Sequence, residues 1–334
     1  MEFGFLGYTA LQTDKPGVLD RVCAEAQAVE DAGFDYYSLI EHHQADYDEY
    51  SSPLIWLAAL AARTRTIKLG ATVILPPLYH PIRLAEDTAN LDVISGGRLF
   101  LAGGAGYQEK DFAAMGVPMR ERGQRMNEIM EILPLAWRGE PFSYQGKIFT
   151  YKDVKVTPKP IQQPIPFWGG GGAEAAVRRA GRMCAGWIGS NNARLSQLEQ
   201  IVPMYRNEAE RSGRKPYIAL CRNGSVAGSM EEAKSVYGEA LLRHYHILEQ
   251  YSGASQNTGE QLRDLSDPLG DGINFILGTP EDCIRQIDFY RSKFGIDALF
   301  IRGRTPQGPD PAQVLASIRL WAEVIHHYNG KRQH

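Results

Sequence analysis

Short apolar runs and longer amphipathic stretches alternate along the chain. Runs of period two, or of unbroken apolar residues, predict strands. They lie at residues 3–8, 35–40, 67–75, 98–102, 167–168, 186–188, 218–227 and 298–301. Helical spacing predicts helices between them, among these residues 17–32, 53–63, 81–94 and 119–138. The chain therefore shows eight β-α units.

Eight such units predict an α/β fold of the closed (β/α)8, or TIM-barrel, type. A doubly wound sheet is the weaker interpretation, because no G-x-G-x-x-G fingerprint follows the first strand. We therefore expect one barrel domain over residues 1–334. Two segments fall outside the barrel pattern and are interpreted as insertions. Residues 139–165 suggest a hairpin with a Pro-rich return, and residues 251–273 a polar loop where barrels often carry a lid.

Composition narrows the class of protein. The chain is 43% hydrophobic and 22% charged, which excludes a disordered or fibrous protein. A net charge of −3 without a long basic run argues against nucleic acid as a partner. The longest apolar stretch is too short to cross a bilayer, and the N-terminus has no basic signal region, so we expect a cytoplasmic protein without a membrane partner. Four cysteines without a CxxC pair suggest neither a disulfide framework nor a structural zinc site.

The helix predicted over Pro53–Ala62 is apolar on every face. Its sequence, PLIWLAALAA, is unlike that of an outer barrel helix with one side in water. A second copy of the chain would cover this surface in a symmetric dimer. Coverage by an insertion of the same chain is the alternative.

Barrel enzymes carry their active sites at the carboxyl ends of the strands. The second strand runs into Glu41, His42 and His43, of which alternation lets only one histidine face the barrel mouth. A histidine there suits general acid-base chemistry, although a plain hydrogen-bonded histidine is equally compatible with the pattern. We expect no metal site, because no third ligand is marked by spacing and His244 and His246 face apart on a helix.

Two glycine clusters also follow predicted strands. Gly103, Gly104 and Gly106 end the fourth strand, and by themselves they are best interpreted as a tight turn. The run Gly169–Gly172 precedes a helix, which leaves backbone N–H groups free to bind an anion. This second cluster predicts a phosphate cradle.

Longer motifs carry a family resemblance. They are AEDAGFDYYSLIEHH, GATVILPPLYHPIRLAEDTANLDVISGGRLFLAGGAGYQEKDFAAMGV, FWGGGG and LGTPEDCIRQIDFYRSKFGIDALFIR. With these motifs the chain resembles the bacterial luciferase-like, flavin-dependent oxidoreductases over nearly its whole length. The resemblance implies a (β/α)8 barrel that binds flavin at its mouth.

The resemblance also assigns roles to residues. It implies that His42 is the catalytic histidine beside the flavin ring and that the Thr72–Val73 peptide is cis beneath the ring. The implied cofactor-binding residues are Glu41, Thr72, Val73, Gly103, Gly104, Gly106, Gly170, Gly171 and Gly172. Tyr107 and Arg302 are weaker candidates for the substrate pocket or its lid.

One departure from the luciferases concerns the flavin site. Luciferases place a cysteine and an arginine where this chain has Gly104 and Ala105. Light emission is therefore not expected. Backbone amides, or an arginine that the sequence does not identify, must then balance the phosphate charge.

The function implied by the resemblance is a two-component monooxygenase. It would take reduced FMN from a separate flavin reductase and use dioxygen to oxygenate a small organic substrate, which the sequence does not identify. A deazaflavin-dependent hydride transferase on the same barrel is the first alternative. A non-catalytic flavin-binding protein is the second, and a zinc-dependent hydrolase is disfavoured.

Overall fold

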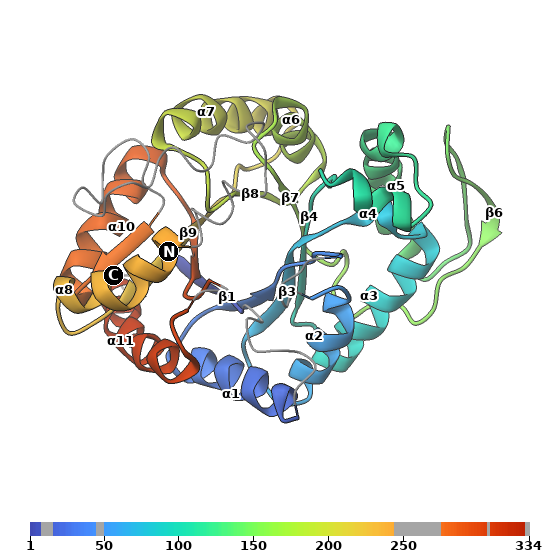
Figure 1. The fold of residues 1–334 in the computed structure, drawn as a ribbon. Helices are drawn as coiled ribbons and strands as arrows, with labels where there is room; N and C mark the ends of the chain where they lie inside the picture. The colour runs from blue at the N-terminus through green and yellow to red at the C-terminus, as the bar shows by residue number, and fades with distance from the viewer. Residues whose placement is uncertain (8–15, 45–49, 244–274, 306–307, 331–334) are drawn as a thin grey trace.

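The computed structural model describes residues 1–7, 16–44, 50–243, 275–305 and 308–330. Parallel strands form a closed barrel inside a ring of helices (Figure 1). The barrel strands are β1 (Glu2–Leu6), β2 (Tyr36–Leu39), β3 (Lys68–Ile74), β4 (Leu99–Gly103), β7 (Phe167–Gly170), β8 (Gly186–Gly189), β9 (Ile218–Val226) and β11 (Ala298–Arg302). Strand β11 pairs with both β9 and β1, which closes the ring. The predicted barrel is confirmed.

Helices cover the outer surface of the barrel. They are α1 (Val18–Asp31), α2 (Pro53–Ala61), α3 (Pro81–Ser95), α4 (Glu109–Ala114), α5 (Arg122–Ala136), α6 (Glu174–Met183), α7 (Leu195–Arg211), α8 (Met230–Ala233), α10 (Pro280–Phe294) and α11 (Pro311–Gly330). Local chemistry sets their ends. Helix α10 begins with a capping box between Thr279 and Asp282, and it ends at Gly295, whose φ is 54°. Among the described residues, no helix combines the length and apolar character needed to span a bilayer.

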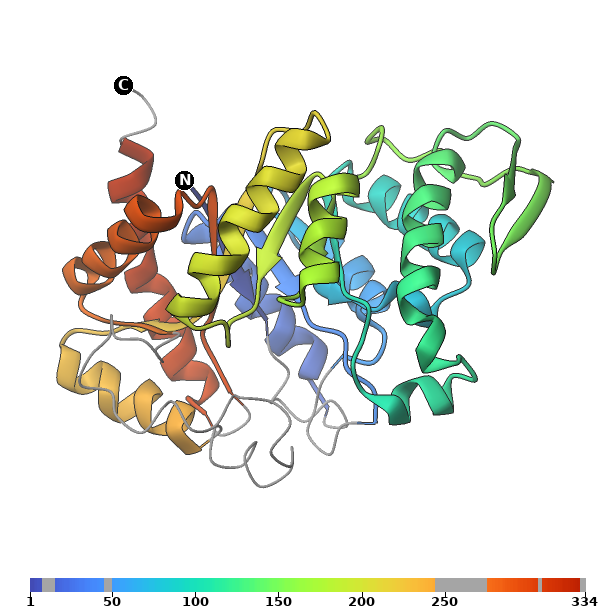
Figure 2. The same ribbon diagram turned by 90° about the horizontal axis from the view of Figure 1, so that it is seen from above.

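Two elements lie outside the closed ring. Strands β5 (Phe142–Gln145) and β6 (Thr150–Val154) form the expected antiparallel hairpin, which projects beside α5 (Figures 1 and 2). The Glu128 carboxylate accepts backbone N–H groups from the hairpin turn at 2.9–3.2 Å. Strand β10 (Phe275–Gly278), which the sequence pattern did not reveal, pairs with the second half of β9. The predicted lid, residues 251–273, and His244 and His246 lie outside the described residues.

Aromatic rings fill the barrel interior. Tyr36, Phe100, Trp168 and Phe300 each come from the first three residues of their strands, and their ring centroids lie 4.9–6.0 Å apart. Gly70 leaves room for this packing, because a Cβ there would lie 2.3 Å from the Phe100 carbonyl oxygen. The filled half of the barrel confines any interior cavity to the carboxyl ends of the strands.

Helix α2 packs on its own chain more closely than its sequence suggests. Leu57 and Leu60 are fully buried, so the expectation that they need a partner subunit is wrong. The apolar surface that stays exposed is smaller than the fully apolar helix predicted from the sequence. Ile55 is 72% exposed, and at the end of α3 Val93 and Ile94 are 43% and 56% exposed. Leu54 and Trp56, on either side of Ile55, are half-buried.

The four cysteines are free thiols in separate elements, and all are buried. Burial raises the pKa of Cys184 and of Cys221 to about 12. It raises the pKa values of Cys23 and Cys283 as well.

Candidate active site

A cavity of about 600 Å³ opens at the carboxyl ends of β2, β3, β4 and β7. This is the end of the barrel at which the sequence analysis placed the site. The structure gathers there nine of the predicted residues: Glu41, His42, Val73, Gly104, Gly106, Tyr107, Gly170, Gly171 and Gly172. Thr72, Gly103 and Arg302 are not among the lining residues.

His42 and His43 follow the end of β2 and have different surroundings, because His42 lines the cavity and His43 bonds to Glu41. His42 lines the cavity just beyond the end of β2. Burial, together with the nearby positive charge of Arg302, lowers the pKa of His42 to about 4. The imidazole is therefore neutral at pH 7. It presents a nitrogen lone pair and an N–H group to the site.

Glu41 organises the wall behind His42. Its carboxylate is 2% exposed and accepts three hydrogen bonds, from His43 Nε2 at 2.9 Å, Tyr79 Oη at 2.9 Å and the Leu75 N–H at 2.6 Å. These bonds tie the end of β2 to the segment after β3. The hydrogen bond to Glu41 also raises the pKa of His43, against the opposing effect of burial. Glu41 therefore shapes the cavity wall while its charge is held by protein donors.

Two glycines pack against Val73, which is next to Glu41 in the cavity wall. A Cβ on Gly104 would lie 2.8 Å from Val73 Cγ2, and one on Gly170 would lie 2.3 Å from Val73 Cγ1. The Thr72–Val73 peptide bond is cis, as the resemblance implied. Val73 thus packs directly against two bare backbones, which any side chain at Gly104 or Gly170 would prevent.

Three expectations about individual residues differ from the geometry. Gly103 serves packing outside the cavity, because a Cβ there would lie 2.4 Å from the Phe167 ring. Thr72 turns to Ser38, with 2.7 Å between the two hydroxyl oxygens. Arg302 is 8% exposed at the end of β11 and is not a rim or lid residue. Its charge acts on His42 from inside the barrel.

The cationic end of the cavity was not predicted from the sequence. Arg120 lines it from the short turn before α5, Arg122 from the first residue of α5, and Arg179 from α6. Gly171 and Gly172, which precede the N-terminus of α6, line the same cavity. Spacing could have revealed Arg179, because it lies one helical turn after Ala175 and Ala176, which also line the cavity. This end combines free N–H groups, a helix dipole and guanidinium groups, and it therefore suits a phosphate.

Known proteins resemble the chain over most of its length. The model of the luciferase-like monooxygenase family matches residues 1–297. An alkanal monooxygenase alpha chain from a Kryptophanaron alfredi symbiont is 28% identical, over 86% of this chain and 82% of that protein. The crystal structure of monooxygenase RslO1 from Streptomyces bottropensis superimposes with a TM-score of 0.84 and 26% identity. That match covers 98% of this chain and 100% of the other.

Two further relatives bear on the cofactor. The oxygenase component of a flavin-dependent trigonelline monooxygenase from Acinetobacter baylyi is 27% identical, over 69% of this chain and 64% of that protein. An F420-dependent glucose-6-phosphate dehydrogenase from Microbacterium testaceum is 32% identical, over 55% of this chain and 57% of the enzyme. The chain therefore spans less than two thirds of the length of both relatives.

We expect His42 and His43 to give opposite pH dependences of stability. The folded-state pKa of His43 lies above 6.5, so its protonation stabilises the fold as the pH falls from 8 to 6.5. The folded-state pKa of His42 is about 4, so the unfolded chain binds that proton first. The fold then loses stability from pH 6.5 to 4, by at most about 1.4 kcal/mol per pH unit. Urea unfolding of the parent protein and of His42→Gln and His43→Gln measures both effects.

The two substitutions serve as controls for each other. The stability of His43→Gln should rise less than that of the parent between pH 8 and 6.5. His42→Gln should lose less stability than the parent below pH 6.5. Curves for the two variants that both run parallel to the parent's would contradict these pKa directions.

Proposed function

The chain belongs to the luciferase-like monooxygenase family, and from that premise we propose that it is a flavin-dependent monooxygenase. The observation that carries the proposal is the neutral, half-buried His42 in a cavity that also has apolar lining residues and a cationic end. The net reaction takes an organic substrate, dioxygen and reduced flavin. One oxygen atom enters the product, the other leaves as water with two hydrogens from the reduced flavin, and oxidised flavin remains.

The cavity fits reduced flavin mononucleotide. The isoalloxazine ring would lie against Val73, whose side chain is fixed by its packing on the Gly104 and Gly170 backbones. Its phosphate would be held by Arg179 and by the N–H groups around Gly172, at the start of α6. Arg120 and Arg122 supply further positive charge at the same end. The arginine that luciferases carry in place of Ala105 is therefore compensated from α5 and α6.

The residues of this chain contribute proton handling and exclusion of water. When bound, reduced flavin supplies the electrons that activate dioxygen. His42 is neutral at pH 7 and can accept or donate a proton at a ring nitrogen beside the substrate, a role worth roughly 10²- to 10⁴-fold in rate. Ile40, Val73 and Leu75 line the same cavity with apolar side chains, and a bound flavin and substrate would displace water from it.

A deazaflavin-dependent hydride transferase is the second candidate. The 32% identity to an F420-dependent dehydrogenase favours it, and the cationic end of the cavity would accept the phosphate of either cofactor. Such an enzyme transfers hydride without consuming dioxygen, so oxygen uptake separates the two candidates. A non-catalytic flavin-binding protein would show neither activity.

The proposal extends to partners and location. A separate flavin reductase would supply the reduced cofactor, as the name "oxygenase component" says of the trigonelline enzyme. The four buried free thiols fit a reducing compartment, and we propose that the enzyme works in the cytoplasm. A second copy of the chain would cover the exposed Ile55 and the half-buried Leu54 and Trp56 beside it on α2.

The function is tested by oxygenation assays on the parent protein and on His42→Ala. A flavin reductase with NADH supplies reduced FMN, and decanal, dimethyl sulfone, trigonelline and a cyclic ketone are offered under ¹⁸O₂. We expect one substrate class to take up one labelled atom. In His42→Ala, oxygenation should fall by at least ~10²-fold and hydrogen peroxide should become the main product. Binding of reduced FMN should stay within a few fold of that of the parent.

His43→Gln is the matched control for that assay. It should keep turnover per folded molecule, because His43 contacts Glu41 and does not line the cavity. If His42→Ala incorporates oxygen into the product as efficiently as the parent protein does, the catalytic role of His42 is refuted. Hydride transfer from reduced F420 to an alcohol or aldehyde, without any ¹⁸O incorporation, would replace the proposed function with the second candidate.

Phosphate binding is tested at Gly172. A side chain fits there, since the nearest atom to a Cβ is Ile201 Cδ1 at 3.5 Å, whereas the φ of 110° at Gly171 would strain any substitution. Gly172→Asp should weaken FMN binding by at least about 10-fold and riboflavin binding by less than about 2-fold, because the new carboxylate repels only the phosphate. Gly172→Ala is the uncharged control. Equal weakening of both ligands, measured by fluorescence quenching, would mean that the segment does not bind phosphate.

The dimer is tested at Ile55. We expect the parent protein to sediment as a dimer at micromolar concentration, and Ile55→Lys to shift it toward monomer without unfolding it, because this side chain is exposed in the single chain. Leu19→Lys is the control, since Leu19 is a partly exposed apolar residue on a different helix. A monomeric parent protein would end the dimer proposal.

A further inference from the structure

A second cavity, of about 410 Å³, lies between α5 and α6. It is at the other end of these elements from the flavin site. Phe167 begins β7 and lines this cavity, whereas Gly170 ends β7 and lines the flavin site. In the same way, Met183 at the end of α6 lines this cavity and Arg179, one turn earlier, lines the other. The two cavities are therefore separate sites at opposite ends of shared elements.

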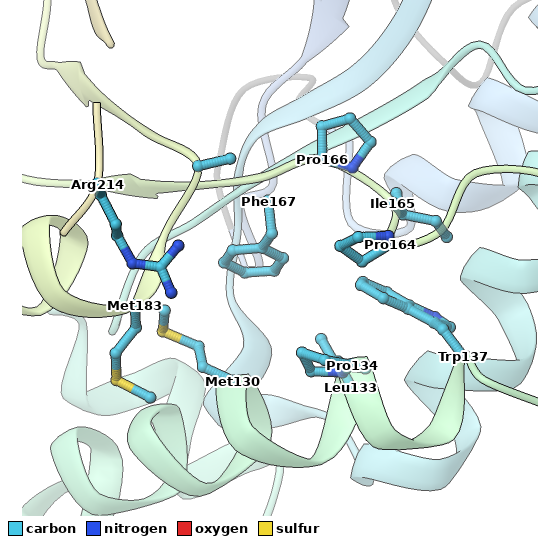
Figure 3. Close-up of a pocket in the computed structure, with 11 residues that line it drawn as sticks. Met130, Leu133, Pro134, Trp137, Pro164, Ile165, Pro166, Phe167, Met183 and Arg214 are labelled. Atoms are coloured by element: carbon cyan, nitrogen blue, oxygen red, sulfur yellow. The ribbon is translucent and has the colours of Figure 1, made fainter. Parts of the chain in front are cut away.

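The wall of the second cavity is almost entirely apolar (Figure 3). Ten of its eleven lining residues have apolar side chains: Met130, Leu133, Pro134, Trp137, Pro164, Ile165, Pro166, Phe167, Met183 and Ala185. Several of these also belong to the hydrophobic core, since Leu133, Trp137 and Ile165 are each 1% exposed. A cavity of this volume and lining is typical of a small-molecule site.

Arg214 is the one charged residue among those that the structure places around this cavity. Its Nε donates to the Arg182 carbonyl at 2.9 Å, which anchors the guanidinium group at the rim. Figure 3 shows the guanidinium turned toward the cavity, near Phe167 and Met183. No acidic residue lines the cavity in the described part of the chain. The terminal N–H groups of Arg214 are thus placed to pair with an anion that enters above the apolar wall.

We propose that this cavity is a second ligand site, which binds a medium-chain aliphatic carboxylate. The chain of such a ligand lies among the apolar side chains and its carboxylate pairs with Arg214. This arrangement satisfies both features of the cavity, because an apolar ligand would leave the guanidinium unused and a small polar anion would leave the apolar wall exposed to water. The site does not depend on the proposed function, since it shares no lining residue with the flavin cavity.

The test is calorimetric titration of the full chain with octanoate and with 1-octanol, each with and without saturating FMN. Octanoate should bind with a dissociation constant on the order of 10 to 100 µM, as expected for a ligand of this size. FMN should not displace it. Arg214→Gln should weaken octanoate by about 10-fold or more and change 1-octanol by less than about 2-fold, because only the carboxylate loses its partner.

Two further variants complete the experiment. Ala185→Trp places a large ring over the cavity at an exposed position and should abolish binding of both ligands. Lys215→Gln is the matched control, an exposed cation beside Arg214 that does not line the cavity, and should bind octanoate like the parent. Absence of octanoate binding, its displacement by FMN, or equal weakening of both ligands by Arg214→Gln would each overturn the proposal.

Discussion

The space inside a closed barrel of eight strands must be filled, and the way it is filled determines where this protein can do chemistry. Interlocked aromatic rings occupy the amino-terminal half, and Gly70 provides the room for Phe100. No such plug closes the opposite half in the described part of the chain, where glycines end β4 and β7. The cavity at the carboxyl ends is therefore set by side-chain volume before any functional group is considered.

The same packing also determines the environment of His42. Val73, which packs between two bare backbones, lines the same cavity as His42 with an apolar side chain, and the loss of water keeps the His42 imidazole neutral. Behind it, the buried Glu41 carboxylate joins two strand ends through three protein donors. The low dielectric that keeps His42 uncharged also strengthens the hydrogen bonds of Glu41. Burial therefore accounts for both the neutral state of His42 and the stability of the wall behind it.

The barrel and the centre of the candidate site could be predicted from the sequence, because both depend on residues that are close together in the chain. Strand periodicity predicted the eight barrel strands, and the adjacent Glu41, His42 and His43 follow one of them. Arg120, Arg122 and Arg179 were missed because they converge only when α5 and α6 pack side by side. Gly103 was assigned to the wrong surface, since its outward packing on Phe167 depends on the register between β4 and β7. Strand β10 is only four residues long and follows an aperiodic segment, so periodicity did not mark it.

The burial of all four cysteines has a consequence for an enzyme that handles dioxygen. Any turnover in which reduced flavin is consumed without oxygenating a substrate releases hydrogen peroxide inside the protein. Peroxide attacks thiolates far faster than thiols. With pKa values of about 12, Cys184 and Cys221 hold a negligible thiolate fraction at pH 7, and peroxide has little access to them. Burial thereby protects the cysteines of this protein from the hydrogen peroxide that the proposed reaction would release.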